Sequence, residues 1–283
     1  MLDQLVMFGL TLSALYSLAA IGFTLIFGVG RISNLSHGTF LMLAGYAFYI
    51  LHQVAGISLW LSFLLAVLTC VVYSVMVFKG IVEKIMGNPM KEIFSTLILA
   101  IIVEQAITLT CGDYPLNVYP IVQGVSIIGA VRISNNILVV LGISWVAIIA
   151  LLIFIHKSNL GRAIRAISMN RELAVIMGID TSRLNLITWT LAGILAGLAG
   201  VFYSSYTYLK PDIWLTPLVM SFSIVIIGGI GSVKGSLVAA NIIGFVESYV
   251  MLFVNERLRG VITLAILILI LLFRPKGLFG EEA

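Results

Sequence analysis

Residues 157–183 read KSNLGRAIRAISMNRELAVIMGIDTSR and lie between two long apolar stretches. Seven of these 27 residues are charged, whereas only 10% of the whole chain is. The 283 residues are 61% hydrophobic with a mean hydropathy of +1.16, and a soluble domain has only about 45–50% apolar residues. We therefore interpret the chain as an integral membrane protein, and this polar segment as a surface that receives a partner.

Eight or nine apolar runs approach the roughly 20 residues that a helix needs to cross a bilayer. They lie at about 5–29, 38–56, 58–78, 93–111, 137–156, 185–208, 214–230, 236–254 and 260–273. The first run lacks a basic flank and a cleavage site, so it is interpreted as a membrane helix and not as a signal peptide. The sequence predicts an all-α polytopic membrane protein, a single domain over residues 1–283, with some segments broken or re-entrant.

The basic residues predict the orientation, because Lys and Arg are retained on the cytoplasmic side. With residues 157–183 inside, twelve of the 16 basic residues face the cytoplasm. The other four face outward: Arg132, Lys210, Arg257 and Arg259. This arrangement places the N-terminus outside and the C-terminus inside, which nine crossings satisfy and eight satisfy only if one is re-entrant. The net charge of +4 then reflects sidedness, and no nucleic acid partner is predicted.

Within the polar segment, apolar residues recur at spacings of three and four, which predicts one amphipathic helix. They are Ala166, Met169, Leu173, Ile176 and Met177. Gly178 is expected to end the helix, since glycine adopts the left-handed conformation without steric cost. Such a helix suits a groove on a partner protein; the alternatives are a solvated loop or a helix in the headgroup plane.

Two further regions predict irregular structure. Residues 113–136 contain Pro115, Pro120 and Gly124 among Val and Ile, which favours a short strand-like or irregular cap on the outer side. Residues 23–39 and 222–236 each pass from an apolar run through a glycine-rich break into another apolar run. This echo is either a true repeat with discontinuous helices, as transporters often have, or a coincidence.

Four motifs, in order, carry a resemblance to a known family. They are FGVGRISNLSHGTFLMLAGY (27–46), LGRAIRAISMNRELAVIMGID (160–180), GGIGSVKGSLVAA (228–240) and FRPKGLFG (273–280). Over nearly its whole length the chain resembles the permeases of branched-chain amino acid importers of the ATP-binding-cassette class. Residues Glu172 to Gly178 resemble the coupling segment of such permeases, with Leu173 in place of the usual Ala.

The resemblance implies a permease of the cytoplasmic (inner) membrane that works by alternating access in the lipid bilayer. It implies four partners: a second related permease, two cytoplasmic ATPases that carry ATP and Mg, and an external solute-binding protein. The residues implied in ATPase coupling, within the segment 157–183, are Gly161, Arg162, Arg165, Ala166, Asn170, Arg171, Glu172, Ala174, Gly178, Ile179 and Asp180.

No catalytic site is predicted in this chain. Residues 228–236 superficially resemble a phosphate-binding loop, but their order is Lys-Gly-Ser, whereas the loop requires Gly-Lys-Ser or Gly-Lys-Thr. The two cysteines and three histidines are scattered without metal-ligand spacing. ATP hydrolysis is therefore expected on separate chains, and no metal or other cofactor is expected in this one.

Two carboxylates, Glu104 and Glu247, lie inside apolar runs, where an ionisable residue marks a functional candidate. The alternative is a carboxyl group that fixes helix packing. The candidate residues of a substrate path are Ser13, Asn34, His37, Gly38, Glu104, Asn241 and Glu247. Small residues that let helices approach closely, either at a partner permease or inside the subunit, are Ala192, Gly193, Ala196, Gly197 and Gly200.

Two other functions remain open from the residues alone. One is a permease of the same class for urea or short amides. The other is an ion-coupled secondary transporter in which Glu104 and Glu247 carry protons.

Overall fold

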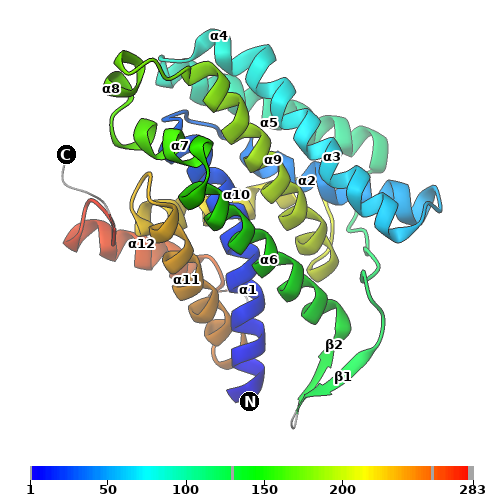
Figure 1. Cartoon of the computed structure of the whole chain (residues 1–283). Coiled ribbons are helices and arrows are strands. Elements are labelled where there is room, and N and C mark those ends of the chain that lie inside the picture. The colour runs from blue at the N-terminus through cyan, green and yellow to red at the C-terminus, as the bar shows by residue number, and fades with distance from the viewer. Residues whose placement is uncertain (1, 129–130, 256–257, 280–283) are drawn as a thin grey trace.

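The chain folds into a bundle of long helices in this computed structural model, which describes residues 2–128, 131–255 and 258–279 (Figure 1). Seven helical stretches of the described chain are long and apolar enough to cross a membrane. They comprise α1 (Leu2–Phe23) with the π-helical turn η1 (Thr24–Val29), α3 (Leu59–Val77) with η3 (Phe78–Val82) and α4 (Glu83–Ile85), α5 (Pro89–Cys111), α6 (Asn135–Lys157), α9 (Thr181–Tyr206), the turn η4 (Pro211–Trp214) with α10 (Leu215–Gly228), and α11 (Val233–Phe253).

The other two predicted segments are short helices. They are α2 (His37–Tyr49), which continues into the π-helical turn η2 (Ile50–Val54), and α12 (Val261–Phe273). Each α-helix has 13 residues, or about 20 Å at 1.5 Å per residue, against a hydrocarbon core of about 30 Å. Both begin inside the bundle: His37 Nε2 lies 3.1 Å from the carbonyl O of Ala19, and Gly260 N donates to Glu247 at 2.8 Å. That some segments are broken or re-entrant stays a prediction.

Helix α1 is the centre of the bundle. Its most apolar stretch is 94% buried, compared with 11% for α5 and 22% for α6. It packs against α9, α10 and α11, and small residues make that approach possible. A Cβ atom on Gly244 of α11 would lie only 2.4 Å from Ser13 N and 2.6 Å from Ser13 Cα, so α11 can touch α1 only through a glycine. The outer helices α5 and α6 leave most of their apolar surface for lipid.

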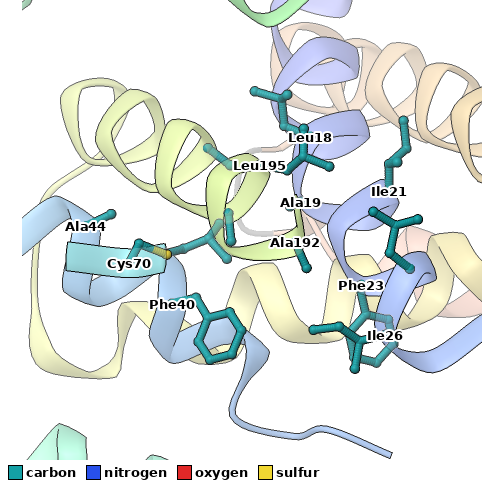
Figure 2. Close-up of a cluster of buried hydrophobic side chains, with 14 of the residues drawn as sticks. Leu18, Ala19, Ile21, Phe23, Ile26, Phe40, Ala44, Cys70, Ala192 and Leu195 are labelled. Carbon is teal, nitrogen blue, oxygen red and sulfur yellow. The ribbon is translucent and has the colours of Figure 1, made fainter. Parts of the chain in front are cut away.

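The largest hydrophobic core lies between α1, α2, α3 and α9 (Figure 2). Leu18 and Ala19 of α1 lie beside Ala192 and Leu195 of α9 in this view, and all four are buried. Phe40 of α2 and Cys70 of α3 extend the same core. The core therefore joins the broken helix α2 to three long ones, which fixes where α2 begins.

The bundle has two distinct ends. The strands β1 (Val125–Ile128) and β2 (Val131–Ser134) form an antiparallel hairpin in which Ser126 pairs with Ile133, as the strand-like expectation for this stretch required. This hairpin and the N-terminus lie at one end, which we call the hairpin end (Figure 1). The helices α7 (Asn159–Met169) and α8 (Arg171–Ile176) lie at the opposite end, the α8 end (Figure 1).

Candidate functional site

The polar segment, residues 157–183, folds as two helices. The prediction of one continuous helix is wrong, because the chain is extended at Asn170 (φ −149°). The Asn170 side chain accepts a hydrogen bond from Leu173 N at 3.0 Å and so starts α8 as its N-cap, a position that Asn favours. Gly178 has φ +80° just beyond α8, which confirms it as the residue that ends the helical segment.

Helix α7 is fixed on the bundle by its inner side. Ile164 and Ile167 are buried there. Gly161 permits the tight turn from α6, since a Cβ atom on it would lie 2.4 Å from the carbonyl O of Ile155. Arg162 and Arg165 are exposed on the other side. Helix α7 is thus a rigid support that presents two cations to the solvent.

Helix α8 and the residues beside it expose an apolar surface, which we call the α8 face. It consists of Met169, Leu173, Val175, Ile176 and Met177. The exposed fraction reaches 78% at Ile176 and 81% at Met177. Contiguous exposed apolar side chains outside a membrane core mark an interaction site. Four of the five stripe residues predicted from the sequence, Met169, Leu173, Ile176 and Met177, are therefore exposed at α8 or directly beside it.

The residues implied in coupling have different environments. The exposed ones are Arg162, Arg165, Asn170, Glu172, Gly178 and Asp180; the half-buried ones are Ala166, Arg171 and Ile179; and the buried ones are Gly161 and Ala174. Asp180 accepts a hydrogen bond from Arg183 N at 3.0 Å and caps α9. Asn170 and Asp180 therefore set the ends of helices, while Glu172 is exposed beside the α8 face.

Two contacts tie this segment to the membrane helices. Arg171 Nη1 donates to the carbonyl O of Gly30 at 3.0 Å, directly after the π-helical end of α1. Ser182 hydrogen-bonds to Glu83, which also pairs with Lys79 at 2.9 Å. Arg171 of α8 is therefore bonded to the end of η1, and Ser182 in the first turn of α9 is bonded to the start of α4.

The two glycine-rich breaks meet at this same end. A Cβ atom on Gly28 would lie 2.6 Å from Gly231 N, and Thr24 Oγ1 lies 2.7 Å from Ser236 Oγ. The C-terminal stretch packs against the second break, since Leu278 N donates to the carbonyl O of Ile227 at 2.8 Å. The sequence echo between residues 23–39 and 222–236 thus corresponds to two breaks that pack against each other.

The predicted path residues fall into two groups. In the first, Asn34 accepts from Ser36 N at 3.0 Å, and His37 bonds to the carbonyl O of Ala19. A Cβ on Gly38 would lie 2.1 Å from the carbonyl O of Trp214. Glu104 accepts from Trp214 Nε1 at 2.9 Å. These residues surround the start of α2.

The second group lies between α1, α11 and α12. Ser13 Oγ donates to the carbonyl O of Asn241 at 3.2 Å. Glu247 is buried, and its Oε1 accepts from Gly260 N at 2.8 Å and from Thr263 Oγ1. Glu247 thereby holds the first turn of α12, so this carboxylate fixes helix packing.

The small residues of α9 pack inside the chain. A Cβ on Gly193 would lie 3.0 Å from Val71 Cα, one on Gly197 3.1 Å from Val67 Cα, and one on Gly200 2.2 Å from the carbonyl O of Leu41. Ala192 and Ala196 are fully buried. Their contacts are with α1, α2 and α3, so they leave no surface here for a second permease.

The environment of Arg259 differs from the one that the sequence predicted. Arg259 was expected in an outward-facing loop, but its side chain is only 19% exposed and its Nε lies 3.5 Å from Glu247 Oε2. The buried carboxylate of Glu247 attracts the guanidinium. Arg257, also predicted to face outward, lies outside the described residues.

A cavity of about 440 Å³ opens next to Arg259, between α1, α9, α10 and α12. Its wall includes Tyr16, Tyr203 and Thr216, and none of the predicted path residues. This site was hardly predictable from the sequence, because its residues come from four helices that are distant along the chain. The one usable signal was an arginine close to the start of a strongly apolar helix.

Glu92 is a second residue that the sequence reasoning missed. It is 2% exposed, and its two carboxylate oxygens accept from Ser33 N and Gly87 N, each at 3.0 Å. It holds the loop that leads into α2 against the start of α5. The signal was an acidic residue in the first helical turn after Asn88 and Pro89, a position where the helix dipole favours negative charge.

No cluster of three or more His, Cys, Asp or Glu side chains able to hold a metal occurs in the part of the chain that the structure describes. The polar groups instead form helix caps and tie neighbouring helices together. Taken together, the geometry provides an exposed apolar surface at α8, a hydrogen bond from Arg171 to the end of η1 and a separate cavity within the bundle.

Comparisons with known proteins identify relatives over nearly the full length. The family described as "Branched-chain amino acid transport system / permease component" matches residues 5–271. The high-affinity branched-chain amino acid transport system permease protein LivH of Salmonella typhimurium is 27% identical over 96% of this chain and 94% of its own. Permease protein BraD of the corresponding system of Pseudomonas aeruginosa is 26% identical over 99% and 96%.

A more distant relative covers only part of the chain. The inner membrane ABC transporter permease protein YjfF of Escherichia coli is 28% identical over 39% of this chain and 36% of its own. No solved structure matches the chain significantly.

Proposed function

Because the chain belongs to the family of branched-chain amino acid transport permease components, we propose that it is the membrane subunit of an ATP-driven importer for leucine, isoleucine, valine or related amino acids. The full-length similarity to LivH and BraD supports this substrate class. The subunit forms the path through the cytoplasmic (inner) membrane and catalyses no chemical reaction. ATP and Mg bind to separate ATPase chains.

The proposed orientation places the hairpin end outside and the α8 end in the cytoplasm. The excess of Lys and Arg in the loops assigned to the α8 end supports it. The N-terminus is then outside and the C-terminus is inside, where Leu278 and Phe279 pair with the end of α10.

The α8 face is the observation that carries the proposal. Ile176 and Met177 are among its most exposed side chains, and this end of the molecule lies in water in the proposed orientation. An amphipathic helix with such a face fits a hydrophobic groove on a partner. We assign the two ATPases of the importer as that partner, one on this subunit and one on a second, related permease.

The contacts of Arg171 and Ser182 define how motion enters the membrane. Closure of the ATPases on ATP displaces α8. Arg171 transmits this displacement to Gly30 directly after η1, and Ser182, in the first turn of α9, transmits it to Glu83, the first residue of α4. Since α1 is the central helix, its tilt changes access to the interior from both ends. Substrate arrives from an external solute-binding protein at the hairpin end.

The rival function of an ion-coupled transporter has less support. Its two proton carriers would be Glu104 and Glu247, and each holds a neighbouring helix through hydrogen bonds to Trp214 or to Gly260 and Thr263. It also leaves the α8 face without a role. Transport of urea or short amides has no observation in its favour beyond membership of the wider permease class.

The test is the retention of the ATPase by tagged permease in detergent. Ile176→Asp places a charge in the centre of the α8 face, and we expect it to lower retention about tenfold or more, as for a central interface residue. Ile127→Asp is the matched control, since Ile127 is 70% exposed in the hairpin at the opposite end. Equal retention of the ATPase by the two variants contradicts the proposal.

A further inference from the structure

The cavity beside Arg259 has the size and depth of a substrate site. Its volume is about 440 Å³, within the roughly 300–1,000 Å³ of small-molecule sites. Tyr16, in its wall, is the middle residue of the span Asp3–Val29. Transporters bind substrates near the bilayer midplane, at helices that are interrupted there.

The cavity has a guanidinium at one end. Arg259 lines it, and its Nη2 lies 3.5 Å from the Tyr16 hydroxyl. Gly260, also in the wall, directly precedes the 13-residue helix α12, and the N-terminus of a helix favours an anion. A guanidinium next to a helix N-terminus is a suitable environment for a carboxylate.

Glu247 contacts the Arg259 guanidinium from outside the cavity. It is 1% exposed and does not line the cavity. One of its oxygens fixes Gly260 N, and the other lies 3.5 Å from Arg259 Nε, longer than the roughly 2.7–2.9 Å of a tight charge-assisted hydrogen bond. The pair holds the guanidinium at the cavity wall by electrostatic attraction without drawing it fully into the protein.

The rest of the wall is mostly apolar. Leu215, Val219, Met220 and Leu264 line it, and together they provide a surface for an aliphatic side chain. Thr216 and Tyr203 add hydroxyl groups, which can accept from an ammonium group. A guanidinium at one end and an aliphatic wall match a small amino acid that carries a carboxylate at one end and a branched side chain at the other.

We propose that this cavity binds the transported amino acid during passage, with its carboxylate against Arg259 and the start of α12, and its side chain against α10 and α12. The assignment rests on the proposed function and adds the site and the group that it recognises. An amino acid amide, which has the same side chain and no carboxylate, binds much more weakly.

The experiment measures protection of a thiol in the cavity. Thr216→Cys is made in a background of Cys70→Ala and Cys111→Ser, and the permease–ATPase complex is placed in lipid nanodiscs. We expect leucine to slow labelling by N-ethylmaleimide at least threefold and leucinamide to leave it unchanged. Tyr119→Cys, in the loop before the hairpin, is the control, and leucine should not alter its labelling.

A second variant tests the role of the arginine. Arg259→Gln alone leaves the buried Glu247 unpaired, which destabilises a protein strongly, so the variant used is Arg259→Gln with Glu247→Gln. This double variant should assemble with the ATPase and lose protection by leucine. Equal protection by leucine and leucinamide, or full protection of the double variant, overturns the assignment.

Leucine uptake by the same wild-type complex separates this inference from the proposed function. A complex that transports leucine without protection of the thiol overturns the cavity assignment alone. A complex that shows neither uptake nor protection overturns both.

Discussion

Arg171 is the residue through which the α8 segment reaches the central helix. We predict that Arg171→Ala retains the ATPase but lowers uptake per ATP hydrolysed about tenfold, because a hydrogen bond to a charged group contributes about 1.5–3 kcal/mol and this one joins α8 to Gly30. The measurement compares uptake with ATP hydrolysis in proteoliposomes. Lys157→Ala is the control, since Lys157 is an exposed cation at the end of α6 and is not among the residues implied in coupling. An equal loss of coupling in both variants contradicts the predicted role.

Gly244 is the residue at which α11 touches α1. Gly244→Ala would place Cβ 2.4 Å from Ser13 N, so the helices must separate, and overpacking of this kind costs about 1–3 kcal/mol. We predict a lower Tm in detergent, measured by thermal unfolding. Gly142→Ala in α6 is the control: no atom lies within 4 Å of its Cβ, and alanine is the better helix former by about 0.8–1.0 kcal/mol. A Tm for Gly244→Ala equal to or above that of Gly142→Ala would contradict this packing.

At the scale of the element, α8 depends on its N-cap. Asn170→Ala removes the bond to Leu173 N, and loss of such a cap costs about 1 kcal/mol. We predict that α8 frays and that ATPase retention falls several-fold, while the Tm of the bundle stays unchanged. Asn170→Asp keeps a cap acceptor and should retain the ATPase. Normal retention by Asn170→Ala would show that the helical form of α8 is not needed for docking.

The elements differ in how well the sequence predicts them. The long spans were predictable because each needs only a continuous apolar run, and the polar segment was recognisable because charge is rare elsewhere in the chain. Its division at Asn170 was missed, since the i, i+3, i+4 pattern continues across the break and cap geometry depends on one side chain. The hairpin was only partly predictable, because its register comes from the pairing of two strands.

The sites were less predictable than the elements. Glu104 and Glu247 were recognised as unusual, but a sequence does not tell which partners a buried carboxylate finds. Arg259 was assigned to an outer loop because a turn back into the bundle leaves no local signal. The cavity combines residues of α1, α9, α10 and α12, whose proximity is set by tertiary packing alone.

At the scale of the whole molecule, the two ends must face opposite sides of the membrane. We predict that Met177→Cys reacts with an impermeant thiol reagent only from the cytoplasmic side, and Ile127→Cys only from the outside. Both side chains are highly exposed in the subunit, at 81% and 70%, and the permease is expressed without its ATPases so that Met177 stays uncovered. Intact cells and inverted vesicles supply the two accessible sides. Reaction of both cysteines from the same side contradicts the orientation.

The most direct test of the central claim is uptake by the purified complex in proteoliposomes. The permease, its partner permease and the ATPases are reconstituted, the solute-binding protein is added outside, and ATP is enclosed. The account predicts accumulation of labelled leucine, isoleucine or valine that requires ATP and persists when the proton gradient is abolished, with no uptake of urea or acetamide. Accumulation driven by a proton gradient without ATP, or uptake of the amides in place of the amino acids, would contradict it.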